Sequence, residues 1–372
     1  MFSKFILFDP ELESQIGHHF DLSIRLLESL KNDGYTVSIL TSKKIDSDSK
    51  TKLEKFATVF PFFTTNHYQY PNKSKFPIIG ELYKFIKNSK NLSKMLKNVP
   101  EGDVWIWHTF FPTELYACGL ADIKKPIAAC LHNEPDTPNW CNKLMWKLAF
   151  NKAANVNLKM NVGGFDKKYL NNYLPLIPNK NINIFPFPFD GRLLDRQKKK
   201  LKKIGFFGHQ RQEKGSLIIK IVEKLILDGY EIVIHDTAEQ IKFTHKNVKN
   251  IGYVEDLSSE IINCDLVVLP YDSNSYKSVC SGILSYVISC GIPVVVPLNS
   301  SLSYWMNKIG SGVCFEEYTP ESVVKAVNNI KNNYYKISLD AYNFSKKWKK
   351  TYGIKKFSDE LISDKNFFYS KY

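Results

Sequence analysis

The stretch KIGFFGHQRQEKGS, residues 203–216, decides the expected fold of this chain. A short apolar run ends at Gly208, and a polar, basic loop leads directly into the periodic pattern SLIIKIVEKLILDG (216–229). The pattern predicts a buried strand, a tight turn and an amphipathic helix. YEIVIHD (230–236) then predicts a second buried strand, which completes a β-α-β unit with parallel pairing.

The same alternation continues toward the C-terminus. CDLVVLPY (264–271) and IPVVVP (292–297) are expected as strands, and SGILSYVISCG (281–291) as the helix between them. Further helices are expected at 257–262 and in PESVVKAVNNIK. Residues 204–340 therefore predict a complete doubly wound α/β domain.

The N-terminal half, residues 1–185, predicts a second Rossmann-like domain. KFILFDP (4–10) ends in a turn signal, and TVSIL is a second buried run after a helical pattern. Residues 186–203 carry prolines, a glycine and a basic run, which is typical of an interdomain linker. Residues 341–372 are expected to form a C-terminal helix that packs back on the N-terminal domain.

Two expected strands of this half end in a histidine, WIWH at His108 and AACLH at His132. The carboxyl ends of strands in such sheets face the ligand crevice, so both are candidate site residues, although a strand-end histidine can equally be structural. Glu134 and Asp136 follow; either could act as a base toward a substrate hydroxyl, and the alternative is that both are carboxylates of an ordinary loop.

The 372 residues carry a formal charge of +14, which fits nucleic acid, an anionic membrane surface or phosphate-bearing small molecules as partners. Arginine clusters are lacking, which argues against nucleic acid. No run is long and apolar enough for a membrane helix, and the N-terminus lacks a signal-peptide pattern, so a cytoplasmic protein is expected. The seven cysteines are odd in number and form no C-x-x-C pair, which indicates reduced thiols.

Two further segments have alternative interpretations. Asp46, Ser47 and Asp48 spell the D-x-D metal-binding motif, but their polar, lysine-rich surroundings predict a solvated loop, and no metal or other cofactor is expected. Residues 61–99 mix Phe, Tyr and Lys on an expected helix. That segment suits either contact with an anionic membrane or ordinary packing with solvated lysines.

The loop after Gly208 has the chemistry of a phosphate site. A helix N-terminus offers unpaired N–H groups and partial positive charge, and Arg211 and Lys214 add two cations. The pattern is neither a P-loop nor a G-x-G-x-x-G fingerprint. An ordinary β-α turn with solvated cations is the alternative.

The loop with its Arg and Lys-Gly, the segment from NVKNIGYVED to LPYDS and the pair SGILSYVISCG and GIPVVVP together resemble glycosyltransferase family 4, the group 1 glycosyltransferases. The resemblance spans roughly 205–326 and is weaker in the N-terminal half, where Gly17 and the helix after it look like the family's glycine loop. It implies the α/β GT-B fold, two Rossmann-like domains facing a central cleft.

The resemblance also implies a donor site. Arg211 and Lys214 would bind the diphosphate, and His132 would contact the transferred sugar by hydrogen bonding. The other residues carried over to donor binding lie in the two glycine loops, the nucleotide-base loop, the strand end and the signature helix: Gly17, Gly208, Tyr253, Val254, Tyr271, Ser281, Gly282, Ile283 and Tyr286.

One departure concerns two glutamates that the family usually carries eight residues apart on the signature helix. Here those positions are Ser278 and Tyr286, and neither is acidic. Ribose binding must therefore be achieved differently, and a catalytically silent member is an open alternative.

The resemblance thus implies transfer of a sugar from a nucleotide-sugar to a glycan or lipid-linked hydroxyl acceptor, with retention, in cell-surface polysaccharide or lipopolysaccharide assembly. Three alternative functions stay open. An epimerase would need acid and base carboxylates that the sequence does not reveal, a binding or scaffold member would bind nucleotide without turnover, and a nucleic-acid binder rests on charge alone.

Overall fold

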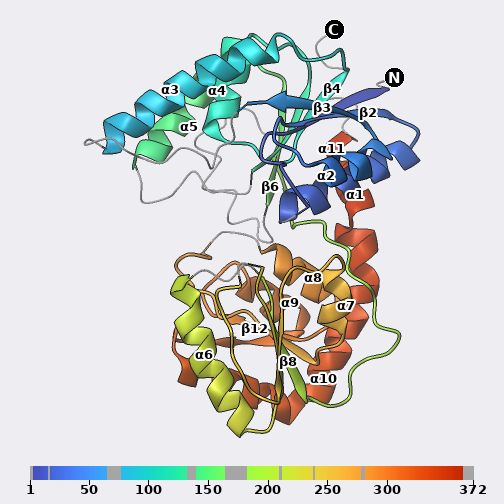
Figure 1. The fold of residues 1–372 in the computed structure, drawn as a ribbon, viewed down its shortest axis with the longest axis vertical. Coiled ribbons are helices and arrows are strands. Elements are labelled where there is room, and N and C mark those ends of the chain that lie inside the picture. Colours follow the sequence, from blue (N-terminus) through green and yellow to red (C-terminus); the bar gives the residue numbers. More distant parts are fainter. Residues whose placement is uncertain are drawn as a thin grey trace. The chain divides into compact units, whose positions relative to one another are not determined.

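The computed structural model describes residues 3–15, 17–64, 77–131, 140–163, 182–208, 212–237, 239–277 and 281–362. Close packing divides the chain into two units, residues 1–185 with 357–372, and residues 186–356. Each unit has its own parallel sheet and its own flanking helices (Figure 1).

The first unit alternates strands and helices along the chain. Its elements are β1 (Lys4–Asp9), α1 (His18–Asn32), β2 (Thr36–Ser42), α2 (Ser47–Glu54), β3 (Thr58–Phe63), α3 (Pro77–Leu96), β4 (Val104–Trp107), α4 (Pro112–Leu120), β5 (Ile127–Leu131), α5 (Trp140–Lys152), β6 (Leu158–Gly163), β7 (Ile182–Phe185) and the late helix α11 (Ile354–Ile362). The strands pair in parallel in the order β3-β2-β1-β4-β5-β6-β7. The chain moves outward from β1 to β3 and then returns to β4, so the sheet has its topological switch point between β1 and β4.

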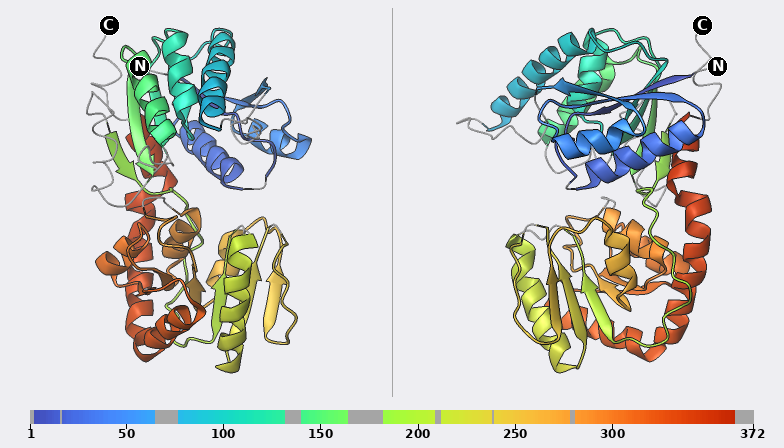
Figure 2. Two further views of the ribbon diagram at one scale, coloured as in Figure 1. Left: turned by 90° about the vertical axis from the view of Figure 1, so that its left-hand side faces the viewer. Right: turned by 45° about the vertical axis from the view of Figure 1, so that its right-hand side comes forward.

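The two faces of this sheet are covered by different helices. Phe8 of β1 and Trp107 of β4 lie in the core that is shared with α3, α4 and α5, and their rings stack with centroids 4.5 Å apart. Because side chains alternate along a strand, the next residues, Asp9 and His108, face the other side, where α1 lies. Figure 2 shows α1 and α2 in blue, apart from α3 to α5 in cyan and green.

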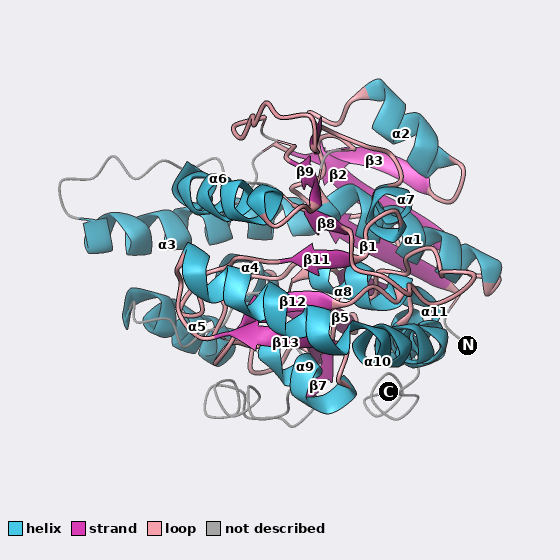
Figure 3. Ribbon diagram, turned by 90° about the horizontal axis from the view of Figure 1, so that it is seen from below, coloured by secondary structure: helices cyan, strands magenta, loops and turns pink. Residues whose placement is uncertain are grey.

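The second unit repeats the same architecture. Its elements are β8 (Lys203–Phe206), α6 (Gln212–Leu227), β9 (Glu231–His235), β10 (Val248–Ile251), α7 (Leu257–Ile262), β11 (Leu266–Val268), α8 (Gly282–Cys290), β12 (Val294–Pro297), α9 (Ser303–Ile309), β13 (Gly312–Phe315) and α10 (Pro320–Tyr352). Its strands are parallel in the order β10-β9-β8-β11-β12-β13, with the switch point between β8 and β11. Figure 3 distinguishes the strands of both sheets from the helices that flank them.

The segment before β8 packs through aromatic side chains. The rings of Phe187 and Phe189 are stacked, and Phe189 also stacks on Tyr286 of α8 with centroids 4.8 Å apart. Trp348 of α10 is buried and donates its indole N–H to the carbonyl of Phe189 at 2.9 Å. The first residues after the first unit are therefore fixed to α8 and α10 within the second unit.

Two local expectations were wrong. Ser47 and Asp48 are exposed to solvent, as expected, but they lie in α2 rather than in a loop, because Asp46 accepts the Ser49 N–H at 2.7 Å and caps the N-terminus of this helix. Residues 61–99 do not form one helix, because β3 extends to Phe63 and α3 begins at Pro77. In the described ranges, no helix has the length and apolar character needed to cross a membrane.

Candidate active site

A buried carboxylate lies at the switch point of the first sheet. Asp9 ends β1, His108 follows β4 directly, and His19 lies in the first turn of α1. The side chain of Asp9 is fully buried, as is that of His108, whereas 11% of the His19 side chain is exposed. The carboxyl ends of strands beside a switch point are where ligands bind in open α/β sheets.

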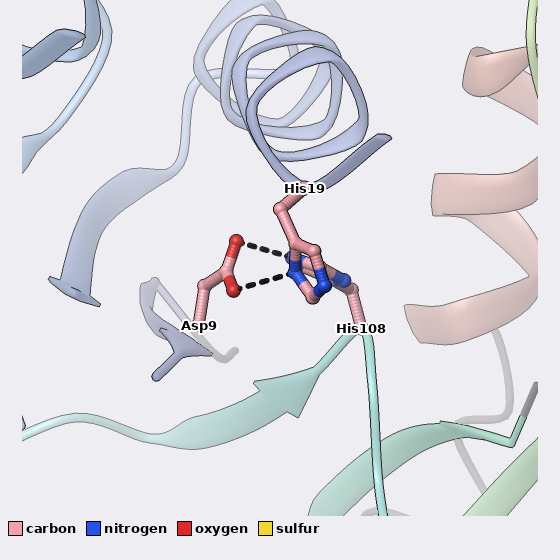
Figure 4. Close-up of side chains that lie close together, drawn as sticks. All are labelled: Asp9, His19 and His108. Atoms are coloured by element: carbon pink, nitrogen blue, oxygen red, sulfur yellow. Dashed lines mark hydrogen bonds and ion pairs between the residues drawn. The ribbon is translucent and has the colours of Figure 1, made fainter. Parts of the chain in front are cut away.

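Both histidines bind the same carboxylate through different oxygens (Figure 4). His19 Nδ1 lies 2.8 Å from Asp9 Oδ1, and His108 Nε2 lies 2.6 Å from Asp9 Oδ2. Ser23 of α1 donates its hydroxyl to Oδ2 at 2.9 Å, and Thr109 Oγ1 lies 3.0 Å from His108 Nδ1. Three donors thus converge on Asp9, as a buried carboxylate requires.

These contacts favour the ionised form of Asp9. Burial by itself would raise the pKa of Asp9, but the charges and hydrogen bonds of His108 and His19 outweigh it and hold that pKa far below its usual range. Burial lowers the pKa of His19, but the charge and hydrogen bond of Asp9, with the charge of Glu11, more than reverse this, and the net pKa is raised. Asp9 is therefore ionised, and the His19 nitrogen that faces it carries a proton.

The same three side chains offer a His₂Asp set of ligand atoms within 4.8 Å of one another. Their contacts are those of hydrogen bonds, because each ring nitrogen lies at 2.6–2.8 Å from its own carboxylate oxygen and Ser23 donates to one of the two. We therefore assign the cluster as a hydrogen-bonded carboxylate with two imidazoles.

A second buried carboxyl group lies on the helix that follows His108. Glu114, in the first turn of α4, is 6% exposed and accepts the Phe111 N–H through Oε2 at 3.0 Å. Burial, and then the charge of Glu11, raise the pKa of Glu114 to about 8. The raised pKa favours the protonated form of Glu114, a carboxylic acid that can donate a proton.

The second unit gathers several of the predicted donor residues at its own switch point. Gly208 follows β8 with a φ of 124°, and a Cβ at that position would lie 3.5 Å from Ile283 and 3.6 Å from the hydroxyl of Tyr271. Ser281 shares a hydrogen bond with Tyr271 and caps α8 by accepting the Leu284 N–H at 3.3 Å. Four residues predicted from the sequence are thus neighbours.

Two glycines determine the backbone geometry at this switch point of the second sheet. Gly208 adopts a left-handed backbone and donates its N–H to His235 Nδ1 at 3.3 Å. At Gly282 a Cβ would lie 2.7 Å from the ring of Phe189, so a side chain would collide. His235 was missed by the sequence analysis; it ends β9, and burial lowers its pKa, which favours the neutral ring that can accept the Gly208 N–H.

The other predicted donor residues in the described ranges lie as follows. Tyr253 follows β10 and is 49% exposed, with Val254 partly buried beside it. Tyr286 is buried, and its ring is parallel to that of Phe189. Gly17 is exposed, has a φ of 97° and immediately precedes α1.

Several predicted residues lie outside the described part of the chain. These are His132, Glu134, Asp136, Arg211 and Ser278. The backbone of Lys214 lies in α6. The sequence analysis missed Asp9, His19 and Glu114; the only local signal was that Asp9 ends an apolar strand and His19 follows the glycine loop.

Comparison with known proteins identifies the fold. No protein-family model matches the chain, and no curated protein matches it by sequence. Solved structures do match. Sucrose-phosphate synthase from Thermosynechococcus elongatus has a TM-score of 0.67 at 10% identity, covering 96% of this chain and 97% of that one.

Two further structures match to a similar extent. The glycotransferase of kitacinnamycin has a TM-score of 0.65 at 12% identity over 96% of this chain and 98% of that one. HepE from Anabaena, solved with UDP and glucose, has a TM-score of 0.64 at 14% identity, again over 96% of this chain and 98% of that one. Together with two parallel α/β sheets whose switch points each carry a polar cluster, these matches show that the chain has the GT-B fold of glycosyltransferases.

Proposed function

We propose that this chain transfers a sugar from a nucleotide-sugar to a hydroxyl group of a glycan or lipid-linked acceptor. The observation that carries the proposal is the convergence of Gly208, Tyr271, Ser281 and Ile283 at the switch point of the second sheet. This is where open α/β sheets bind nucleotides. The HepE structures with UDP and with UDP-glucose support a nucleotide-sugar as the ligand of this fold.

The donor would be held mainly by backbone N–H groups and cations. The N-termini of α6 and α8 favour anions, and Arg211 and Lys214 supply positive charge for the diphosphate. Tyr253 and Val254 would lie against the base, and the resemblance to family 4 implies that Gly17 takes part in donor binding and that His132 contacts the sugar. These groups neutralise the leaving diphosphate without a metal ion.

The test is a thermal-shift and mass-spectrometric panel of nucleoside diphosphates and nucleotide-sugars. Stabilisation by one nucleotide series is expected for the wild type and is lost in the Arg211→Ala, Lys214→Ala double variant. Lys325→Ala, Lys336→Ala removes the same charge from exposed positions of α10 and should behave as wild type. If millimolar nucleotide fails to stabilise the wild type, the proposed function is wrong.

A non-catalytic nucleotide-sugar-binding or scaffold role is the second candidate. It is favoured by Ser278 and Tyr286 at the positions where the resembled family carries glutamates. Tyr286 uses one face of its ring against Phe189, so this side chain is part of the packing of the unit. Binding of a nucleotide-sugar with no release of sugar or nucleotide over hours would select this role.

The anomeric outcome separates two courses of the reaction. The resemblance favours retention, in which the leaving phosphate accepts the proton of the acceptor. The inverting course needs a base on the protein instead, and Glu134 or Asp136 could serve as that base. The identity of the released anomer distinguishes the two directly.

A lipid-linked acceptor would place the protein at the cytoplasmic face of a membrane, and α3 offers a surface for this. Ile79 and Tyr83 are 67% and 66% exposed, with Lys84 and Lys87 beside them. Exposed apolar side chains flanked by lysines suit an anionic bilayer surface. Sedimentation with phosphatidylglycerol vesicles should be weaker for Tyr83→Ser than for Tyr335→Ser, a control that removes a tyrosine of similar exposure, 59%, from α10.

A further inference from the structure

The glycine turn after β8 is held by a side chain of the neighbouring strand. β8 and β9 pair in parallel, with Phe206 opposite Ile234. The next residues, Phe207 and His235, therefore lie side by side at the carboxyl edge of the second sheet, with their ring centroids 5.9 Å apart. Nδ1 of His235 accepts the N–H of Gly208 at 3.3 Å in a buried hydrogen bond, which is stronger than one that water can replace.

The start of α8 encloses the turn from another direction. A Cβ built on Gly208 would lie 3.5 Å from Ile283 and 3.6 Å from the hydroxyl of Tyr271. That hydroxyl shares a hydrogen bond with Ser281, the N-cap of α8. Because β8 lies between β9 and β11 in the sheet, the turn has His235 of β9 on one side and the segment from β11 to α8 on the other.

The hydrogen bond requires a neutral imidazole in one tautomer. A backbone N–H only donates, so Nδ1 of His235 must accept, and the proton of the neutral ring lies on Nε2. Burial lowers the pKa of His235 below its ordinary value of 6.5, although the negative charges of Asp236 and Glu260 oppose this. The Glu260 carboxylate is itself paired with Lys249 at 3.1 Å. At neutral pH the ring is therefore uncharged and can accept the Gly208 N–H.

A turn that is already fixed favours anion binding at the end of β8. α6 begins at Gln212, four residues after Gly208, and the N-terminus of a helix attracts anions. Glycine has more backbone freedom than any other residue, and Gly208 has a φ of 124°. A glycine turn that was not held would lose this freedom when a ligand bound, whereas a turn that is held before binding avoids this entropy cost.

We propose that His235 is a positioning residue of the donor site, which holds the Gly208 turn in the conformation that binds the diphosphate of the donor. This rests on the proposed glycosyl transfer from a nucleotide-sugar. His235 acts through the main chain of Gly208. Its replacement should therefore weaken the binding of the phosphate groups and leave the binding of the base and ribose unchanged.

The experiment compares two substitutions that differ in the position of one polar atom. In His235→Asn the amide oxygen Oδ1 takes the place of Nδ1 and can accept the Gly208 N–H, whereas the longer side chain of His235→Gln carries its amide near the place of Nε2. Calorimetric titration measures the Kd of the nucleoside diphosphate that stabilises the wild type most, and of the same nucleoside without phosphates. We expect the Kd of the diphosphate to rise about tenfold in His235→Gln and less than about threefold in His235→Asn, with that of the nucleoside unchanged.

His245→Gln is the matched control. His245 also accepts a backbone N–H through Nδ1, from Asn247 at 3.1 Å, but it is exposed and precedes β10, at the opposite edge of the sheet from Gly208. This variant should bind the diphosphate as the wild type does. A diphosphate Kd of His235→Gln within about threefold of wild type, or an equal loss in His235→Asn, overturns the inference.

Three results separate the possible failures. If His235→Gln loses nucleoside binding as much as diphosphate binding, the substitution disturbs the whole unit and the positioning role is overturned. Long-range ¹H–¹⁵N spectra of the wild type near neutral pH should show a proton on Nε2 of His235 and none on Nδ1; the reverse tautomer overturns the inference without any ligand. A wild type that no nucleoside diphosphate stabilises contradicts the proposed function itself.

Discussion

Replacing Glu114 with glutamine should make the first unit more stable, and the gain should grow with pH. In the folded chain the pKa of Glu114 lies at about 8, above its ordinary value of 4.5, because the side chain is buried and Glu11 repels its charge. The folded state therefore favours the protonated form. Stability from this group is complete below about pH 4.5 and is lost as the pH rises through about 8.

The size of the effect follows from this displacement of the pKa. At about 1.4 kcal/mol per pH unit, a rise from 4.5 to about 8 corresponds to about 5 kcal/mol as an upper limit. Glutamine keeps the size of the side chain and an oxygen that can accept the Phe111 N–H, and it cannot ionise. Between pH 5 and pH 8 the free energy of unfolding of Glu114→Gln should rise by several kcal/mol relative to wild type.

Urea unfolding at several pH values, followed by tryptophan fluorescence, measures this difference. Trp105, Trp107 and Trp146 are buried in the first unit and report its transition. Glu101→Gln, at an exposed position of the same unit, is the matched control and should show no growing difference. If the difference between Glu114→Gln and wild type stays within about 1 kcal/mol from pH 5 to pH 8, the burial of an uncompensated carboxyl group is refuted.

Three further predictions concern stability and metal. Ser281→Ala removes the N-cap of α8, whose hydroxyl accepts the Leu284 N–H, and should lower the free energy of unfolding of the second unit by about 1 kcal/mol in urea denaturation, whereas Ser281→Asp should restore the cap. Gly312→Ala would place a Cβ 2.0 Å from the Val294 carbonyl oxygen and 2.5 Å from the sulfur of Met306; it should cost about 3 kcal/mol or more in the same assay, and a loss below 1 kcal/mol would contradict this packing. Donor hydrolysis should be unchanged by excess EDTA, and activity that disappears and returns with added Mg²⁺ would show that a metal is required.

The local hydrophobic pattern was sufficient to locate the strongly apolar helices and strands. The strands at 104–107 and 127–131, and the β-α-β units that begin with β1 and β8, lie where their hydrophobic runs predict them. The hydrophobic pattern did not predict α2. This short helix carries mostly polar residues and has no apolar stripe, and it depends on the cap by Asp46 and on the burial of Leu53.

The residues of the candidate sites also fall into two groups, those that the sequence could single out and those that it could not. A glycine turn followed by a helix start is a local signal, so the loop at Gly208 and the start of α8 at Ser281 could be singled out from the sequence. His235 could not, because its role depends on the neighbouring strand that brings its ring to the Gly208 N–H. The same holds for Glu114, whose raised pKa comes from burial.

The sequence by itself determined that this is an α/β chain with two doubly wound halves, because consecutive residues show the hydrophobic periodicities of strands and of helices. Only the tertiary structure decided which polar strand ends meet. Asp9 and His108 are 99 residues apart, and they share a hydrogen bond because the chain places β4 beside β1 after completing β2 and β3. Strand order is set by long-range pairing and packing, and no local pattern encodes it.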